Sequence, residues 1–423
     1  MFSIDTMSED WENVILLSAD ALRADHLSCY GYHRDTSPVL DELAEESIRF
    51  TNAYSASSHT REAVPALLTG KYPDVAVDSG YRLVTETIAS TLSKEGFSTG
   101  GFHSNPYVSR AYGFDEGFDK FDDDLNLGQN RFIALAQRAW DKLRGRHYAR
   151  ASEINARSLE WLESVDEPFF LWNHYMDTHG PYEPPGEYAT LYSETGGKDR
   201  DVQTLYQRAI DEPDSITEEE RELLINLYDA EIRYNSDLIG EFLEELDRRG
   251  LLENSLVVFT ADHGDAFYEH GYYEHPRYLH DEITHVPLLV REPGRNSVTV
   301  EAPVSTLDIT STIANKVVGE ADGVSLFEEI PENRTVFSQA RGEYENDHLW
   351  RYAARSEGGV SLCERNQETD EMEFTGDGGE VLRDELKDYV ERRVRRMNGE
   401  EPESEHESDA EIERRLEALG YKE

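Results

Sequence analysis

The sequence predicts an α/β fold built on a large, mixed but mostly parallel β-sheet, with a small α+β subdomain at the C-terminal end. Apolar runs of strand length recur along the chain, and helical segments alternate with them, which is typical of a sheet covered on both faces. Near residue 320 the pattern changes to short strands separated by turns. We therefore expect a large domain over residues 12–320 and a subdomain over residues 330–423.

Five apolar runs predict the buried strands. The first, residues 13–18, contains no alternating polar residue and stops just before Asp20. Continuous apolar runs of this length suit parallel strands that are covered on both sides. The other runs are residues 98–103, 168–176, 255–261 and 286–290. Chemistry in such sheets gathers outside the carboxyl ends of the strands.

Helices are predicted between these strands. Residues 37–46 begin with Ser37 as the N-cap and Pro38 at the first helical position. The remaining predicted helices are residues 61–69, 85–95, 131–165 and 218–250.

The C-terminal part has a different pattern. Residues 335–373 indicate short strands joined by hairpin turns, and a charged stretch follows them. Residues 398–409 have the composition of a disordered acidic linker. Helical spacing returns at residues 410–420, so we expect the subdomain to close with a terminal helix.

The charge of the chain is unusual. It has 88 acidic and 41 basic residues, for a net charge of −47, and the acidic residues are spread along the whole sequence. Self-repulsion on this scale destabilises a compact state in dilute salt, whereas molar salt shortens the Debye length to about 3 Å. We interpret the composition as that of a halophilic protein. The same charge argues against binding to nucleic acid or to anionic lipid.

Several compartment signals are also informative. The two cysteines, Cys29 and Cys363, form no disulfide framework or zinc pattern. The acidic N-terminus lacks the basic and apolar regions of a signal peptide, and no apolar run approaches the 18 residues needed to span a bilayer. We therefore expect a cytoplasmic protein without a transmembrane segment.

Two motifs that follow predicted strands suggest a metal site. Asp20 follows the first apolar run, and Asp262 and His263 follow residues 255–261. Two carboxylates and one imidazole form a ligand set for one divalent ion. Oxygen ligands favour Ca²⁺, Mg²⁺ or Mn²⁺, and the imidazole leaves Zn²⁺ open. Taken singly, either motif could instead cap a helix or close a turn.

The polar segment before the predicted helix 61–69 offers a nucleophile. Thr60 would lie at the helix N-terminus, where free N–H groups stabilise an anion and favour an alkoxide. An ordinary Thr N-cap explains the same pattern. Histidines, the usual general acids near neutral pH, recur in blocks beside the strand ends. They include His174, His179, His270, His275, His280 and His285.

Three blocks in order resemble the sulfatases of the alkaline phosphatase superfamily. The first joins residues 13–32, 36–55 and 66–73, and the second, PFFLWNHYMDTHGPYEPP, resembles the H-x-x-D-x-H-x-P-Y block. The third, VVFTADHGDAFYEHG followed by HVPLLV, resembles the T-x-D-H-G block. The blocks span roughly residues 12–315. The resemblance implies an alkaline-phosphatase-like sandwich and a sulfatase-like catalytic domain over residues 12–320.

The resemblance also implies roles for individual residues. Asp20, Asp262 and His263 correspond to ligands of one divalent metal ion. His179 is similar to the histidine that contacts the ester oxygens. His275 lies where the family places an imidazole or cationic group near the leaving group.

Two substrate-binding residues are predicted less directly. His103 falls near the region where the family places Lys and His residues on the substrate. Arg61 could supply a positive charge that the family takes from elsewhere in its motif.

The sequence departs from the family at the nucleophile. Sulfatases carry C/S-x-P-S-R before A-x-L-L-T-G, and the Cys or Ser becomes formylglycine. Counting back from Gly70 places Thr60 at that position, with Glu62 and Val64 where Pro and Arg are expected. Threonine cannot yield the aldehyde, so no formylglycine is expected. Ala21 replaces a second Asp of many sulfatases, although His270, His275 and His280 leave a two-metal site open.

Other members of the superfamily, including nucleotide phosphodiesterases, phosphoethanolamine transferases and lipoteichoic acid synthase, use a threonine nucleophile. We therefore expect a metal-dependent hydrolase of sulfate or phosphate esters, of the sulfatase or phosphodiesterase type, that attacks through Thr60. Its substrate would be a small-molecule, glycan or lipid-headgroup ester. A transferase that moves a phospho-headgroup onto a glycan or lipid is the first alternative, and a catalytically inactive family member is the second.

Overall fold

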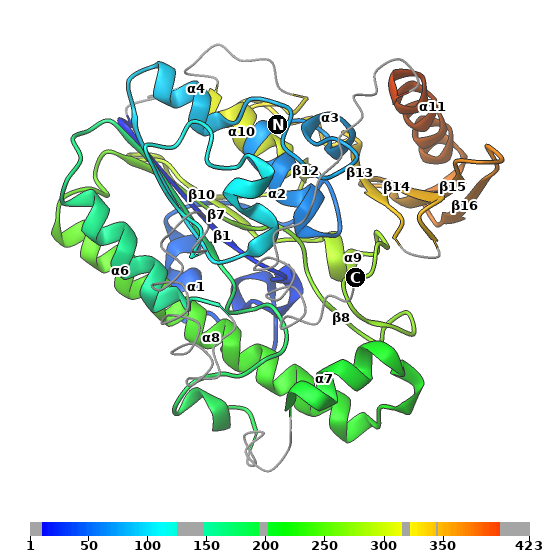
Figure 1. The fold of residues 1–423 in the computed structure, drawn as a ribbon, viewed down its shortest axis with the longest axis horizontal. Helices are drawn as coiled ribbons and strands as arrows, with labels where there is room; N and C mark the ends of the chain where they lie inside the picture. Colours follow the sequence, from blue (N-terminus) through cyan, green and yellow to red (C-terminus); the bar gives the residue numbers. More distant parts are fainter. Residues whose placement is uncertain (1–10, 125–147, 194–201, 315–321, 344–345, 398–423) are drawn as a thin grey trace.

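A computed structural model of the 423-residue chain describes residues 11–124, 148–193, 202–314, 322–343 and 346–397. These residues form one large sheet sandwiched between helices and one smaller sheet near the C-terminal end (Figure 1). Part of the helix predicted at residues 131–165, the linker predicted at residues 398–409 and the terminal helix at residues 410–420 lie outside the described residues.

The large sheet has eight strands in the order β11-β2-β10-β7-β1-β6-β4-β5. Its parallel centre consists of β7 (Ser255–Ala261), β1 (Asn13–Ala19), β6 (Phe169–Tyr175), β4 (Ser98–Phe102) and β5 (Lys120–Asp122). On the other side, β10 (Leu288–Arg291) runs antiparallel to both β7 and β2 (Ile48–Phe50), and β11 (Val298–Val300) runs parallel to β2. The predicted mixed, mostly parallel sheet is therefore confirmed.

Alternating side chains of the central strand face two separate cores. Ile15 and Leu17 of β1 join the core under α1 (Pro38–Glu45), α6 (Ala151–Leu162) and α8 (Glu218–Arg248). Val14 and Leu16 join the core under α2 (Thr60–Thr69), α4 (Ile88–Lys94) and α10 (Leu307–Ala314). These helices cover opposite faces of the sheet (Figure 1), which explains why the central strands carry no polar alternation.

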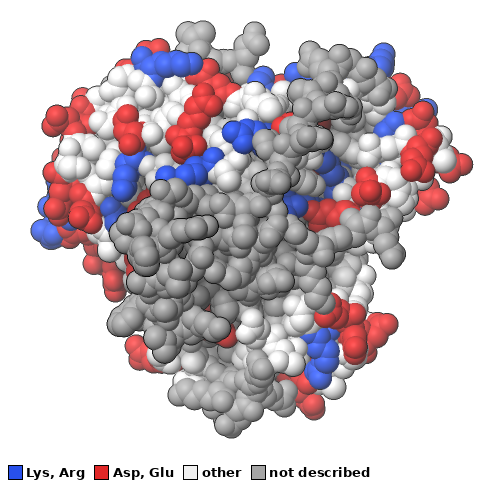
Figure 2. Space-filling view, in the orientation of Figure 1, with Lys and Arg blue, Asp and Glu red and all other residues white. Residues whose placement is uncertain are grey.

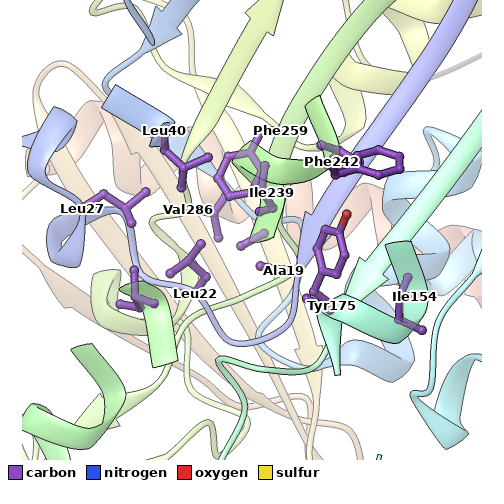
Figure 3. Packing of buried hydrophobic residues seen from close by; sticks show 14 of the residues in the cluster. Ala19, Leu22, Leu27, Leu40, Ile154, Tyr175, Ile239, Phe242, Phe259 and Val286 are labelled. Atoms are coloured by element: carbon purple, nitrogen blue, oxygen red, sulfur yellow. The ribbon is translucent and has the colours of Figure 1, made fainter. Parts of the chain in front are cut away.

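The first of these cores shows how a helix is fixed on the sheet. Tyr175 of β6 and Phe259 of β7 pack with Ile239 and Phe242 of α8, and all four are buried (Figure 3). Burying side chains of this size stabilises the fold by about 1.5–3 kcal/mol each. The N-terminus of α8 is closed by a capping box between Thr217 and Glu220.

Shorter elements surround the sheet edge at the carboxyl ends of the strands. Two small pairs are β3 (Ala53–Tyr54) with β12 (Val304–Ser305), and β8 (Ala266–Phe267) with β9 (Tyr273–Glu274). Among the described residues, the remaining α-helices of the large unit are α3 (Pro73–Ala76), α7 (Val202–Asp211) and α9 (Asp281–Thr284).

The C-terminal subdomain, as far as residue 397, is a four-stranded antiparallel sheet with one helix. Its strands, in order, are β13 (Val336–Arg341), β14 (Leu349–Ser356), β15 (Gly359–Asn366) and β16 (Met372–Gly376). The helix α11 (Gly379–Met397) packs on β14 and β15. The hairpins were predicted, but α11 was not, because its many charged residues conceal an apolar stripe formed by Leu382, Leu386, Tyr389 and Val390.

This subdomain is tied to the large unit close to α2. The Gln339 amide N–H donates to the Ala56 carbonyl at 2.9 Å, and Ser338 Oγ donates to the Ser55 carbonyl at 2.6 Å. Arg393 of α11 forms an ion pair with the buried Asp74 of α3. The first sheet and the second therefore meet beside the segment that leads into α2.

The surface agrees with the composition. On the face shown in Figure 2, acidic side chains are distributed over the described residues with Lys and Arg between them. None of the described helices combines the length and apolar character needed to cross a bilayer.

Candidate functional site

Three residues with metal-ligand chemistry converge at the carboxyl ends of β1 and β7. Asp20, Asp262 and His263 are buried, and their ligand atoms lie within 4.8 Å of one another. The two strands are paired in parallel, and the Asp262 amide donates to the Ala19 carbonyl at 3.2 Å. The sheet register therefore places this strand-end cluster, defined as Asp20, Asp262 and His263.

The hydrogen bonds of the strand-end cluster leave one oxygen of each carboxylate and the Nε2 atom of His263 close to one another. Asp262 Oδ1 accepts from the amides of Ala21 and His263, at 3.2 and 2.8 Å. Asp20 Oδ1 and Asp262 Oδ2 have no hydrogen-bond partner among the described residues, and each lies 3.6 Å from His263 Nε2. Because His263 Nδ1 donates to the Gly264 carbonyl at 3.0 Å, Nε2 faces the two oxygens.

These donors fit a divalent cation. Two buried carboxylate oxygens without hydrogen-bond partners are costly unless a positive charge compensates them. Burial opposes protonation of His263, but the charges of Asp262 and Asp20 outweigh it and raise its pKa. Burial and the charge of Asp20 raise the pKa of Asp262. A cation bound here would replace a proton, as metal binding commonly does.

A second set of residues holds Asp20 in place. Asn105 Nδ2 donates to Asp20 Oδ2 at 2.6 Å, and His174 Nε2 lies 3.2 Å from the same oxygen. Trp172 Nε1 donates to Ser18 Oγ. The same Ser18 oxygen lies 3.0 Å from His174 Nδ1, to which it can donate its own proton. This chain favours the His174 tautomer that donates from Nε2 to Asp20, a common arrangement behind metal-ligating carboxylates.

The backbone after β1 is unusual at the same place. Ala21 has φ of 56°, a left-handed conformation that is rare for residues with a side chain. Its amide is the donor that holds Asp262 Oδ1. Strained residues of this kind concentrate at functional sites, where the surrounding structure holds them.

Thr60 lies against the strand-end cluster. It is the first residue of α2, with His59 as the N-cap. Its hydroxyl oxygen lies 3.1 Å from His263 Nε2 and 3.5 Å from Asp20 Oδ2. The residue that sequence counting placed at the nucleophile position is therefore within reach of an ion held by the cluster.

Two more predicted residues, His275 and His179, lie near His263. The rings of His275 and His263 have centroids 4.3 Å apart, and those of His179 and His275 are 5.2 Å apart. His275 Nδ1 lies 2.8 Å from Asp265 Oδ1, and His179 Nδ1 donates to the Gly180 carbonyl at 2.6 Å. Burial, followed by the charges of His263 and His179, lowers the pKa of His275 well below its ordinary value.

The first turn of α2 also meets a cluster of opposite charges that the sequence did not predict. This arginine cluster consists of Glu62, Arg277, Arg341 and Glu343. Arg277 Nη1 donates to Glu62 Oε2 at 3.0 Å, Arg341 Nε lies 3.4 Å from Glu62 Oε1, and Arg277 also pairs with Glu343.

Arg61 lies between this cluster and two aromatic rings. Its guanidinium lies 4.0 Å from the centroid of the Tyr107 ring and 5.1 Å from that of Tyr81, and 3.8 Å from Glu343. It is partly exposed, unlike the deeply buried Arg277. A planar cation in such a position can approach an anionic ligand.

The structure does not bring His103 together with these residues. Its ring packs against Phe121 and Trp172, and neither nitrogen has a hydrogen-bond partner among the described residues. Burial lowers its pKa to about 3. These are the contacts of a core side chain, and the residue from this segment that reaches the site is Asn105.

Three histidines that the sequence analysis singled out, His270, His280 and His285, are engaged away from the strand-end cluster. His270 and His280 stack on each other with centroids 3.7 Å apart, and His270 is exposed. His285 Nε2 donates to the Thr51 carbonyl at 2.8 Å. Within the described residues, the metal-type group therefore contains two carboxylates and one imidazole.

A separate ion network supports the loop that carries His179. Arg150 pairs with Asp177 at 2.8 Å and with Glu231 at 2.5 Å, and all three are largely enclosed. Asp177 also accepts from the Ala151 amide at the start of α6, and Glu231 from the Glu183 amide. One guanidinium thus serves two buried carboxylates, and burial raises the pKa of Glu231 to about 7.

Comparison with known proteins places these features in context. The chain matches the Sulfatase family over residues 12–317. It is 26% identical over 340 residues to the uncharacterized sulfatase YidJ of Escherichia coli, covering 71% of this chain and 67% of that one. Human iduronate 2-sulfatase is 28% identical over 340 residues, covering 69% of this chain and 61% of its own length. The chain therefore spans about three fifths to two thirds of these relatives.

A solved structure supports the fold. The phosphonate monoester hydrolase of Silicibacter pomeroyi superposes with a TM-score of 0.66 at 20% identity, covering 92% of this chain and 96% of that one. At this identity the likeness concerns the fold, which is the alkaline-phosphatase-like sandwich with its small second sheet.

Proposed function

Because the chain belongs to the sulfatase family of ester hydrolases, we propose that it is a metal-dependent hydrolase of sulfate or phosphate esters in which Thr60 is the nucleophile. The observation that carries the proposal is the position of the Thr60 hydroxyl, 3.1 Å from His263 Nε2 and 3.5 Å from Asp20 Oδ2. No ordinary capping role requires a threonine hydroxyl to face two candidate metal ligands.

Asp20, Asp262 and His263 would hold one divalent ion. Such an ion supplies positive charge that favours the alkoxide of Thr60 and neutralises the oxygens of the ester. Asn105 and His174 keep Asp20 oriented, and the amides of Ala21 and His263 orient Asp262. The hard oxygen donors suit Mg²⁺, Ca²⁺ or Mn²⁺, and the imidazole keeps Zn²⁺ open.

The first step transfers the sulfo or phospho group to Thr60. The Thr60 oxygen bonds to sulfur or phosphorus in line with the leaving oxygen, its proton passes to solvent, and the bond to the alcohol breaks. The departing oxygen takes a proton from His179. Water then attacks the same sulfur or phosphorus atom, and the bond to the Thr60 oxygen breaks as that oxygen takes one proton of the water. The released acid ionises, and the proton it loses can protonate His179 again.

The two histidines would divide their work. His275 is neutral near pH 7 because burial lowers its pKa, and its Nδ1 is directed at Asp265. It therefore orients the leaving group rather than protonating it. His179 has its Nδ1 committed to the Gly180 carbonyl, so a proton on Nε2 is the one it can donate. Arg61 would contact the anionic part of the substrate.

The nature of the central atom remains part of the proposal. The named relatives are sulfatases, whereas a threonine nucleophile without formylglycine favours phosphorus. A transferase would release the covalent intermediate to an alcohol instead of water, so dependence on an acceptor distinguishes it. An inactive family member would bind the metal and turn over no ester.

The test is a rate comparison in molar salt with the full chain and Mn²⁺, Mg²⁺, Ca²⁺ or Zn²⁺ in turn. Substrates are 4-nitrophenyl sulfate, 4-nitrophenyl phosphate and bis-4-nitrophenyl phosphate, and the variants are Thr60→Ala and Thr60→Ser. We expect Thr60→Ala to lose turnover and Thr60→Ser to retain part of it. Turnover that survives in Thr60→Ala would refute the nucleophile assignment.

A further inference from the structure

One carboxylate beside the proposed active site has no evident structural task. Glu274 pairs with Ala266 in the β8–β9 hairpin, which places it next to Asp265 and directly before His275. Its Oε1 atom is enclosed and has no hydrogen-bond partner among the described residues. Its backbone has φ of 66°, a left-handed conformation that residues with a side chain rarely adopt.

The charges that act on Glu274 are all negative. After burial, which is the largest influence, the charges of Asp265, Glu343 and Asp211 raise the pKa of Glu274. A partly buried carboxylate among other carboxylates is unfavourable unless a cation accompanies it. Within the described residues, Arg277 is already engaged by Glu62 and Glu343.

A second polar group comes from the neighbouring helix α7. The Tyr206 side chain comes from α7, which contacts β9, and the residue is only 4% exposed. Its hydroxyl interacts with the Tyr182 side chain without a hydrogen bond of regular geometry, and Asp265 and Glu274 both act on it electrostatically. The hydroxyl lies against Gly180, where an added Cβ would be 2.2 Å from it. Tyr206 therefore borders the loop that carries His179.

Aromatic rings complete the surroundings. Tyr182 meets Tyr206 edge to face, with centroids 5.4 Å apart, and its hydroxyl donates to Asp265 Oδ2 at 2.5 Å. Figure 1 shows α7 beside the hairpin that begins with β8. A carboxylate, a hydroxyl and aromatic rings are the groups that bind an ammonium ion in proteins.

We propose that Glu274 and Tyr206 form a subsite for a primary ammonium group carried by the alcohol part of the substrate. Glu274 and the Tyr206 oxygen accept its N–H donors, while the rings of Tyr182 and Tyr206 contact the carbon atoms beside it. This inference rests on the proposed function, because Glu274 directly precedes His275, and His275 and His179 are the residues proposed to act at the leaving group. It names the substrate class as esters of amino alcohols.

The first experiment measures kcat/KM for a matched pair of esters whose leaving groups are 4-(2-aminoethyl)phenol and 4-propylphenol. Both are prepared as the ester type that the protein turns over fastest. We expect a preference of about tenfold for the amino ester, the scale of one charge-assisted hydrogen bond. In Glu274→Gln the ratio of the two rates should fall to about one, and in Tyr206→Phe it should fall partway.

The rate ratio cancels any general loss of activity in a variant. A wild-type ratio near one, or an undiminished ratio in Glu274→Gln, overturns the subsite. A preference for a quaternary trimethylammonium ester over the primary amine overturns the hydrogen-bonding role of Tyr206 and Glu274. If the wild-type protein turned over none of the esters, that result would count against the proposed function instead.

A binding measurement separates the two proposals. Free 4-(2-aminoethyl)phenol should raise the melting temperature of the full chain more than 4-propylphenol does, and this difference should disappear in Glu274→Gln. Stabilisation by K⁺ alone that is lost in the same variant, without any difference between the two phenols, would identify the subsite as an inorganic cation site and overturn the ammonium assignment.

Discussion

The strand-end cluster and the arginine cluster both meet the first turn of α2, but they are built in different ways. Asp20, Asp262 and His263 follow two neighbouring strands whose register is fixed by a continuous ladder of hydrogen bonds. The arginine cluster joins α2, the segment after β9 and the end of β13 mainly through side-chain ion pairs, with one hydrogen bond from the Arg341 amide to Glu62 Oε2. The difference teaches that the sheet register brings the candidate metal ligands together, whereas contacts between distant segments hold the charged side chains around the start of α2.

The strongest way to sharpen this comparison is to remove a member of the strand-end cluster. Asp262→Asn keeps the shape of the side chain but removes its charge, and we expect kcat/KM to fall on the order of 10⁴-fold, the scale on which essential groups are lost. Isothermal titration should show weaker metal binding. The matched control is Glu86→Gln at an exposed ion pair with Lys94, which should leave the rate unchanged. Equal losses in both variants would contradict the assignment.

The arginine cluster should respond in stability. Arg277→Met leaves Glu62 and Glu343 with less positive charge, and removing one partner of a buried ion pair costs about 3–5 kcal/mol. The free energy of unfolding from denaturant titration measures this. Adding Glu62→Gln to Arg277→Met should recover part of the loss, because the buried charge is then gone. A double variant as unstable as the sum of the single variants would show that the two residues are not coupled.

The support behind Asp20 should give a smaller effect. Asn105→Ala removes the 2.6 Å donor to Asp20 Oδ2, and residues of this kind affect metal affinity or activity by about 10–100-fold. His103→Phe is the informative comparison, because His103 packs among aromatic rings. A larger loss of kcat/KM in His103→Phe than in Asn105→Ala would restore His103 as a substrate-binding residue.

The ion network under the His179 loop should make the free energy of unfolding depend on pH. Burial raises the pKa of Glu231 from 4.5 to about 7, so folding favours its protonated form. The stability from this difference is complete below pH 4.5 and is lost as the pH rises through 7. Each pKa unit corresponds to about 1.4 kcal/mol, so we expect a decline on the order of 2 kcal/mol between pH 5 and 8. Glu231→Gln should flatten this decline in urea titrations; an equally steep decline would contradict it.

The same contrast explains how far the sequence could be interpreted. The strand-end cluster was predictable because each member directly follows a buried apolar run, and parallel strands end at one edge. The same rule pointed to the segment after β4. It could not decide between His103 and Asn105, because only the fold shows that Asn105 contacts Asp20 while His103 packs against Trp172.

The arginine cluster and α11 could not be predicted in this way. Arg341 and Glu62 are separated by 279 residues, and nothing in the local pattern of either marks the pair. Helix α11 was hidden by its charges, although Leu382, Leu386 and Tyr389 have helical spacing. The roles predicted for Thr60, His179, His275 and Arg61 stay predictions, now with distances that make each of them testable.

The attachment of β13 beside α2 has a consequence for engineering. Since residues 336–343 bring Gln339, Arg341 and Glu343 beside the start of α2 while the strand-end cluster lies in another sheet, a chimera that exchanges this segment between homologues would alter the surroundings of α2 and leave the strand ends intact. A library confined to this segment would therefore vary the side chains beside Glu62 and Arg61, while the candidate metal ligands, Thr60 and the two proposed catalytic histidines stay constant.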